Sequence, residues 1–236
     1  MSSKITTMIF DYGGTLDTGG IHWSEKFWEA YQYFHVPVSK EDFRNAFVFS
    51  EKNVQNIIES ESGLRETYRS QLFYQLQYFE KNNLLPGAYY TIIDKLVEYC
   101  HRSVMNNVNE SKMILLRLAS NYKLGIVSNY YGNLITVLNE IRLKKFFSLI
   151  VDSKNVGVRK PDSKIFSLAI ESINSNPDET IVVGDSYTND ISPSKQVGCK
   201  TIWLNVKSWE IPLDIKDADI IINSFSNIEE AINKLL

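Results

Sequence analysis

The sequence predicts an α/β protein in which a parallel-sheet core carries an inserted helical cap domain. In the second half of the chain, short apolar runs alternate with helical stretches, a pattern typical of parallel strands joined by crossover helices. From Trp23 to about Met105, apolar residues recur at helical spacing instead. We therefore place the core at residues 1–17 and 106–236, and the helical cap at residues 18–105.

Taken in order, the first strand is expected at Thr7–Phe10, directly before Asp11. The inserted region should contain roughly four helices, with a break at Pro86-Gly87 before the last one. A helix from Ser111 to Ser120 is then expected to lead into the rest of the sheet. The further strands are expected at 123–127, 148–152, 180–184, 200–204 and 219–222, with helical stretches such as 163–173 between them. Ligands of such sheets bind at the carboxyl ends of the strands, so polar residues there are candidate site residues.

The composition is that of a globular protein with one substantial core: 236 residues, 44% hydrophobic and 22% charged. A net charge of −3 gives no general attraction to nucleic acid or anionic membranes. No apolar stretch approaches the roughly 20 residues of a membrane helix, and no signal peptide is evident. Cys100 and Cys199 lack metal or redox spacing, which suits a reducing compartment. We expect a cytoplasmic monomer or homodimer that binds a small molecule.

Asp11 stands where the first strand opens into a glycine turn. Gly13 and Gly14 let the backbone fold tightly enough for successive N–H groups to converge on an anion. An ordinary turn between strand and helix explains these few residues equally well. The rest of the chain therefore decides between the two interpretations.

Partners for Asp11 occur at three further places. Ser128 lies at the end of a second apolar strand, and Lys160 offers a point charge suited to phosphate. Asp185 follows a third apolar strand, with Asp190 one short loop later. Each residue alone has an ordinary explanation, but the joint order of carboxylate, hydroxyl, lysine and carboxylate pair is hard to obtain by chance.

In this order the chain resembles the haloacid dehalogenase-like (HAD) superfamily, over nearly all of its length. The family's four signatures correspond to Asp11-Tyr12-Gly13-Gly14-Thr15, Ser128-Asn129, Lys160-Pro161-Asp162 and Gly184-Asp185-Ser186 through Asp190. The resemblance implies a Rossmann-like core, a helical C1-type cap that sets substrate choice, and hydrolysis of a small phosphorylated metabolite. It is specific for fold and chemistry class, and weak for substrate.

The resemblance also implies roles for individual residues. Asp11 would attack phosphorus and form an aspartyl-phosphate, while Thr15, Ser128 and Lys160 would hold the transferring oxygens. The residues that would bind phosphate and substrate are Gly13, Gly14, Thr15, Ser128, Asn129 and Lys160. Mg²⁺ would bridge the phosphate, Asp11, the Gly13 carbonyl and Asp185, with Asp190 behind these ligands.

Gly13 departs from the family pattern, because phosphatases of this family carry a second aspartate there as general acid and base. Such catalysis contributes roughly 100- to 10,000-fold. The departure leaves two alternatives open: a catalytically attenuated ligand-binding or regulatory protein, and a haloacid dehalogenase-type hydrolase. The dehalogenase branch generally has serine where this chain keeps Asp185. Two carboxylates beside Asp11 would repel one another without a cation, so Asp185 favours Mg²⁺ and a phosphorylated substrate.

The cap carries further residues of interest. A branch that cleaves carbon–phosphorus bonds needs a cap lysine, for which the candidates by type alone are Lys26, Lys40 and Lys52. The cap aromatics expected in the core are Trp23, Trp28, Tyr31 and Tyr33. Arg65 and Arg69 predict a solvated helix face rather than an anion site.

The histidines expected to have a surface or hydrogen-bonded role are His22, His35 and His101. Because His22 follows the glycine turn that leads into the cap, it is the first residue to test as a substitute acid.

Overall fold

The computed structural model describes residues 4–209 and 212–236. Within them, one sheet of six strands has the order β3-β2-β1-β4-β5-β6, and every neighbouring pair is parallel. The strands are β1 (Thr7–Phe10), β2 (Lys123–Ser128), β3 (Leu149–Asp152), β4 (Thr180–Gly184), β5 (Lys200–Leu204) and β6 (Ile220–Ile222). The predicted parallel α/β core is confirmed, and each expected strand lies within one residue of its observed bounds.

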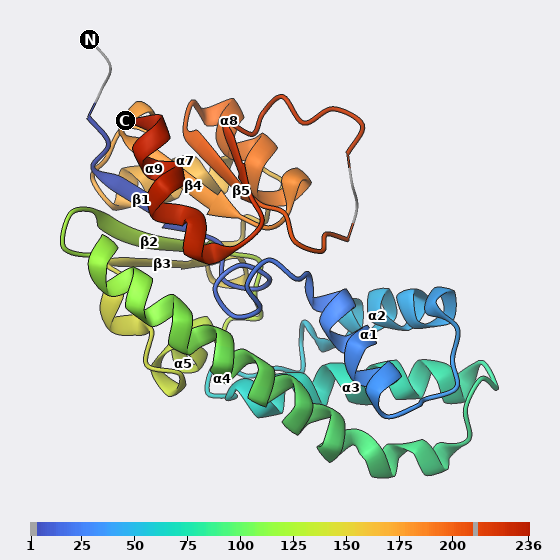
Figure 1. Cartoon of the computed structure of the whole chain (residues 1–236). Coiled ribbons are helices and arrows are strands. Elements are labelled where there is room, and N and C mark those ends of the chain that lie inside the picture. The colour runs from blue at the N-terminus through green and yellow to red at the C-terminus, as the bar shows by residue number, and fades with distance from the viewer. Residues whose placement is uncertain (1–3, 210–211) are drawn as a thin grey trace.

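Helices cover both faces of this sheet, because its central strands are apolar on both sides. They are α5 (Leu134–Glu140), α6 (Ser153–Val156), α7 (Lys164–Ser172), α8 (Ser192–Val197) and α9 (Ile228–Leu235), together with the end of α4 (Ile93–Leu118). Met8 and Phe10 belong to the large apolar cluster that includes residues of α4, α5 and α9. Ile9, which points the other way, belongs to a second cluster with α7. The sheet is thus the middle of three layers (Figure 1).

The inserted region is helical, as expected. It contains α1 (Trp23–Tyr33), α2 (Lys40–Val54), α3 (Leu64–Lys81) and the first part of α4, which a short 3₁₀ turn at Gly87–Ile92 precedes. These helices lie to one side of the sheet layers (Figure 1). None of the helices in the described part of the chain combines the length and apolar character that a membrane crossing requires.

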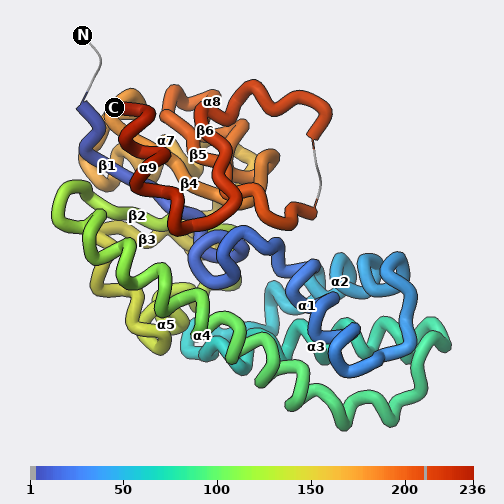
Figure 2. The backbone as a smooth tube through the Cα atoms, viewed as in Figure 1, coloured from blue at the N-terminus to red at the C-terminus, as the bar shows by residue number. Residues whose placement is uncertain are grey.

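One helix joins the two regions, and here the sequence-based prediction was wrong. The separate helix expected at Ser111–Ser120 is the final part of α4, which runs unbroken for 26 residues. Figure 2 shows it passing from the helical region to the sheet. No glycine or proline interrupts it, and its buried residues keep helical spacing from end to end. The proposed division between residues 105 and 106 therefore falls inside one continuous helix.

The cap aromatics divide into three groups. Tyr31 is fully buried, and Trp28 packs against the core while partly exposed. Tyr33 is 64% exposed, so its predicted core position was wrong; it lies against Phe34 and Tyr99 at the surface. Trp23 packs on the same apolar cluster but also lines a cavity, described below.

Candidate active site

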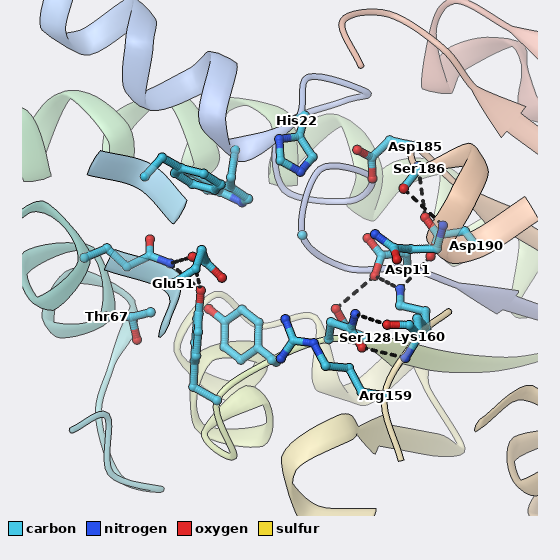
Figure 3. A pocket seen from close by; sticks show the side chains of 18 of the residues that line it. Asp11, His22, Glu51, Thr67, Ser128, Arg159, Lys160, Asp185, Ser186 and Asp190 are labelled. Carbon is cyan, nitrogen blue, oxygen red and sulfur yellow. Dashed lines mark hydrogen bonds and ion pairs between the residues drawn. The ribbon is translucent and has the colours of Figure 1, made fainter. Parts of the chain in front are cut away.

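The ends of three adjacent strands bring the predicted polar residues together. Asp11 follows β1, Ser128 ends β2, and Asp185 follows β4. Because β2, β1 and β4 are neighbours in the sheet, their carboxyl ends lie side by side. Lys160 and Asp190 come from loops over the same edge, and all five are at least nine-tenths buried. Figure 3 shows this group at one side of a cavity.

Asp11 is the centre of the hydrogen-bond network. Its Oδ1 accepts from Ser128 Oγ at 2.9 Å and from Lys160 Nζ at 2.6 Å. Lys160 Nζ also donates to Asp190 Oδ1 at 2.5 Å, so one ammonium joins two carboxylates. Thr15 Oγ1 lies 3.5 Å from Asp11 Oδ2 and donates to Asp185 Oδ1 at 3.0 Å. Asp11 is therefore fixed in orientation, with a hydroxyl and an ammonium beside it.

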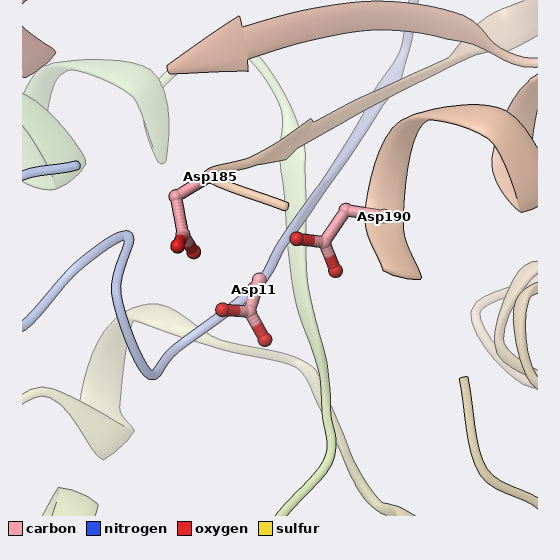
Figure 4. A group of neighbouring side chains, drawn as sticks. All are labelled: Asp11, Asp185 and Asp190. Atoms are coloured by element: carbon pink, nitrogen blue, oxygen red, sulfur yellow. The ribbon is translucent and has the colours of Figure 1, made fainter. Parts of the chain in front are cut away.

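Asp11, Asp185 and Asp190 form an acidic cluster whose carboxylate oxygens lie within 4.8 Å of one another (Figure 4). Asp185 Oδ2 is buried and accepts no hydrogen bond from the described residues. Burial and the neighbouring charges of Asp11 and Asp190 hold the pKa of Asp185 well above its usual value. Burial likewise raises the pKa of Asp190 to about 6, although Lys160 opposes the rise. Oxygen ligands and surplus negative charge are the donor set of a hard divalent cation, so these residues fit a metal ion.

Two glycines make this crowding of carboxylates feasible. Gly14 has a φ of +103°, and a Cβ there would collide with the carboxylate of Asp185. A Cβ on Gly184 would collide with the side chain of Asp190. Any larger residue at either position would push a carboxylate away from Asp11.

Lys160 is held from both its side chain and its backbone. Burial alone would lower the pKa of Lys160, but the charges of Asp11 and Asp190 outweigh burial and raise it above its usual value. Asn129 accepts from Lys160 N and donates to Lys160 O, both at 2.9 Å. Asn129 therefore ties the loop of Lys160 to the end of β2, and it lines the cavity as well.

Position 13 faces an indole. A Cβ on Gly13 would lie 3.6 Å from Trp23 Cδ1 and 3.7 Å from Trp23 Nε1, which is ordinary van der Waals contact. The indole donates to Asp17 Oδ2 at 2.8 Å, and Asp17 Oδ1 accepts from Gly14 N at 2.7 Å. Burial raises the pKa of Asp17 to about 7. In this structure the Gly14 amide is thus occupied by Asp17 rather than free to receive an anion.

The cavity lies between the core and the cap. On the core side it is lined by Asp11, Gly13, Ser128, Asn129, Lys160, Asp185 and Asp190. On the cap side it is lined by α2 and α3 through Phe47, Glu51, Thr67, Tyr68 and Gln71. Tyr131 and Arg159 from core loops, and Trp23 at the start of α1, also line it. The sequence analysis did not single out Glu51, Gln71, Tyr131 or Arg159. Arg159 alone carried a signal, since it directly precedes Lys160.

His22 lines the cavity, but it is engaged in local structure. Its Nδ1 accepts from Ser24 N at 3.2 Å and so caps the start of α1, with Ser24 Oγ 2.8 Å away. Burial lowers the pKa of His22 to about 4, in spite of the opposing charge of Asp11. His22 is therefore neutral near pH 7.

The other cap candidates lie away from the cavity. Lys26 pairs with Glu29, and Lys40 pairs with Glu25. Arg65 and Arg69 pair with Glu98 and Asp94 at exposed sites, as expected for a solvated face. Among the described residues that line the cavity, none of these four occurs, and Lys52, His35 and His101 are absent from the lining as well. Cys100 and Cys199 are free and buried.

Comparison with known proteins agrees with this arrangement. The profile of the family described as haloacid dehalogenase-like hydrolase matches residues 8–204. The chain is 34% identical to a glyceraldehyde 3-phosphate phosphatase of Pyrococcus furiosus, over 55% of this chain and 56% of that protein. It is 27% identical to pyrophosphatase PpaX of Listeria welshimeri, over 83% of this chain and 81% of that protein. The chain spans about half the length of the first curated relatives that it matches.

Solved structures share the fold. YfnB from Bacillus subtilis, in a crystal structure bound to magnesium, has a TM-score of 0.61 at 19% identity, covering 98% of this chain and 100% of that one. The family profile covers most of the chain, including the strand ends that carry Asp11, Ser128 and Asp185 and the loop that carries Lys160. The chain therefore belongs to the haloacid dehalogenase-like hydrolase family.

Proposed function

We propose that this protein is a Mg²⁺-dependent hydrolase of a small phosphorylated metabolite that acts through an aspartyl-phosphate on Asp11. The observation that carries the proposal is the environment of Asp11, a buried carboxylate oriented by Ser128 and Lys160 beside two further carboxylates. The phosphatase names of the relatives support a phosphorylated substrate for this chain as well.

Asp11 is suited to in-line attack on phosphorus because its carboxylate is oriented by hydrogen bonds and lines the cavity. The hydroxyls of Thr15 and Ser128 and the ammonium of Lys160 are the groups that would bind the phosphoryl oxygens as charge spreads over them. In the structure Ser128 and Lys160 donate to Asp11, and Thr15 donates to Asp185. Attack by the carboxylate breaks the P–O bond of the ester and releases the alcohol part of the substrate as an alkoxide or aryloxide. A water molecule then attacks the aspartyl-phosphate, which releases inorganic phosphate and restores the carboxylate.

Mg²⁺ would be held by Asp11, Asp185 and the carbonyl of Gly13, with Asp190, which accepts from Lys160 Nζ, in the same acidic cluster. When bound, the ion would neutralise the charge of the phosphate and of the carboxylates, so that two anions can approach. The buried, unpartnered Asp185 Oδ2 supports such a ligand role.

The general acid of related phosphatases has no counterpart at Gly13. The indole of Trp23 is the side chain beside that position, and an indole N–H is no practical acid. His22 is neutral near pH 7, so it lacks the spare proton of an imidazolium. We therefore expect a strong dependence on the leaving group, with aryl and acyl phosphates cleaved much faster than alkyl phosphates.

The proposal is tested by steady-state hydrolysis of p-nitrophenyl phosphate and propyl phosphate with Mg²⁺, with chelator, and with the Asp11→Asn variant. We expect Mg²⁺-dependent turnover of the aryl ester by the wild type and a loss of at least roughly 1,000-fold in the variant. Asn preserves side-chain size, so circular dichroism should be unchanged. Substantial turnover by Asp11→Asn would show that Asp11 is not the nucleophile.

A second candidate function is a binding or regulatory protein with little turnover, which Gly13 favours. It predicts that phosphate esters bind in the presence of Mg²⁺ with wild-type turnover at background. Calorimetric titration alongside the kinetic assay distinguishes it. A dehalogenase-type hydrolase is the third alternative, and metal-independent release of halide from a 2-haloacid would identify it.

A further inference from the structure

The cap wall of the cavity contains a polar cluster formed by Glu51 of α2, Gln71 of α3 and Tyr131 of the loop after β2. Glu51 Oε1 accepts from Gln71 Nε2 at 2.6 Å and from the Tyr131 hydroxyl at 2.7 Å. Gln71 Nε2 also contacts the Tyr131 hydroxyl. Two cap helices and one core loop therefore fix this carboxylate at the cavity wall.

The hydrogen bonds on Glu51 are unevenly shared between its two oxygens. Both donors go to Oε1, and within the described residues no hydrogen bond reaches Oε2. Glu51 is only partly buried and lines the cavity, so Oε2 can be reached from the cavity. Burial raises the pKa of Glu51, while Tyr131, Arg159 and Gln71 oppose that rise. A carboxylate oxygen in such a place can accept a hydrogen bond from a molecule bound in the cavity.

Arg159 lines the same cavity between the two groups. In Figure 3, Glu51 and Asp11 lie at opposite sides of the pocket, and the side chain of Arg159 extends between them. Arg159 is exposed, and its charge acts on Glu51. Within residues 4–209 and 212–236 its guanidinium makes no ion pair closer than 4.0 Å. A molecule whose phosphate lies at Asp11 would therefore present its organic part to Arg159 and Glu51.

We propose that Glu51 Oε2 is a specificity site that accepts a hydrogen bond from a hydroxyl or N–H group on the organic part of the substrate. Arg159 would then lie beside the oxygen atoms of that organic part. The proposal rests on the proposed function for the position of the phosphate. It names the substrate class as hydroxylated or amide-bearing phosphate esters. A carboxylate at the same place would be repelled by Glu51, and a purely aliphatic group would leave Oε2 without a donor.

The experiment compares glycerol 3-phosphate with propyl phosphate, which has the same number of carbon atoms but lacks the hydroxyls. Their affinities for the Asp11→Asn protein in Mg²⁺ are measured by calorimetry, so that no turnover is needed. We expect glycerol 3-phosphate to bind about 10-fold or more tightly than propyl phosphate, the range typical of a hydrogen bond to a charged group. Adding Glu51→Gln should remove most of that preference while leaving propyl phosphate affinity within about twofold. Glu41→Gln, on the exposed start of the same helix, is the matched control and should keep the preference.

Kinetics of the single Glu51→Gln variant separate specificity from proton donation. A specificity residue lowers kcat/KM for glycerol 3-phosphate and leaves p-nitrophenyl and propyl phosphate unchanged, and the unchanged aryl rate shows that the variant is folded. An equal fall for both alkyl esters would make Glu51 a general acid and overturn the proposal. Equal affinities of glycerol 3-phosphate and propyl phosphate for the Asp11→Asn protein, in which Glu51 is unchanged, would also overturn the proposal. If the hydroxyl preference holds in binding while wild-type turnover is absent, the proposed function fails and the specificity site stands.

Discussion

The two walls of the cavity are built in different ways. On the core wall, Asp11, Ser128 and Asp185 each stand next to an apolar strand, and the parallel order of β2, β1 and β4 brings them together. On the cap wall, Glu51 comes from the last turn of α2 and Gln71 from the middle of α3. The core wall is fixed by a sheet whose edge is a common ligand site, whereas the cap wall depends on how helices pack. Local sequence therefore indicates the residues of the core wall, whereas the residues of the cap wall are recognised only once the helices are packed.

The largest expected effect breaks the core wall at Asp185, a proposed metal ligand. Asp185→Asn removes one negative charge and one strong oxygen ligand from the acidic cluster at almost constant volume. We expect Mg²⁺ binding, followed by calorimetry near neutral pH, to be lost together with aryl phosphatase turnover. Glu51→Gln serves as the cap-wall control and should bind Mg²⁺ like the wild type. Wild-type Mg²⁺ affinity in Asp185→Asn would remove this residue from the metal site.

Lys160→Met tests how much charge balance the core wall needs. It leaves buried carboxylates without their cation, and removing one partner of a buried ion pair costs about 3–5 kcal/mol. We expect urea unfolding to show a loss of that order in chelator, and partial recovery in Mg²⁺, because the ion supplies positive charge at the same place. The control is Lys164→Met, an exposed lysine at the start of α7. A variant as stable as the wild type in chelator would contradict the description of Lys160 as the balancing charge.

His22, where the two walls meet, makes a pH-dependent contribution. Burial lowers its pKa to about 4 in the folded protein, below the ordinary value of 6.5. Between these values the unfolded chain binds more protons, so stability from neutral His22 is complete above pH 6.5 and lost as pH falls towards 4. The loss amounts to about 3 kcal/mol. His22→Asn keeps a helix cap and should flatten unfolding free energy over this interval relative to the wild type. The matched control is His35→Asn, which replaces an exposed histidine. A pH dependence in His22→Asn equal to that of the wild type would contradict a neutral His22.

The smallest effect sharpens the comparison by restoring the missing carboxylate. Gly13 is not in the left-handed region, and a Cβ there only touches Trp23, so Gly13→Asp should fold with a small shift of the indole. We expect alkyl phosphate turnover to rise by roughly 100-fold, the lower end of the contribution of general acid catalysis. Gly13→Asn has the same shape without the acid and should give no such rise. Equal gains in both variants would indicate an effect of loop geometry rather than proton transfer.

Much of the core could be predicted from sequence, for a physical reason. Strands such as Thr7–Phe10 and Thr180–Gly184 are short, apolar and rich in residues with β-branched side chains. Each is followed directly by a polar residue. Glycines at 14 and 184 mark where two carboxylates approach the backbone. Each of these signals lies within a few consecutive residues, so it can be recognised in one sequence alone.

The parts that sequence did not predict depend on contacts between distant segments. Glu51 looks like any other charged residue in α2 until Gln71 and Tyr131 are placed beside it. Tyr33 has the apolar character of a core residue but lies past the packed part of α1. The extent of α4 was missed because a change of domain does not require a change of helix, and its apolar spacing continues through residues 105 and 106.

The continuity of α4 sets a rule for exchanging caps between relatives. The buried stripe that includes Val104 and Val108 crosses the junction, and further along the same helix Ser111 Oγ donates to Leu16 O at 2.9 Å. Each residue inserted at the junction would rotate one half of the helix by about 100° against the other, and two residues would turn the stripe to the opposite side. Seven inserted residues would restore the phase to about 20° while moving the cap outward by roughly 10 Å. A transplanted cap must therefore match its host in helical phase as well as in sequence length.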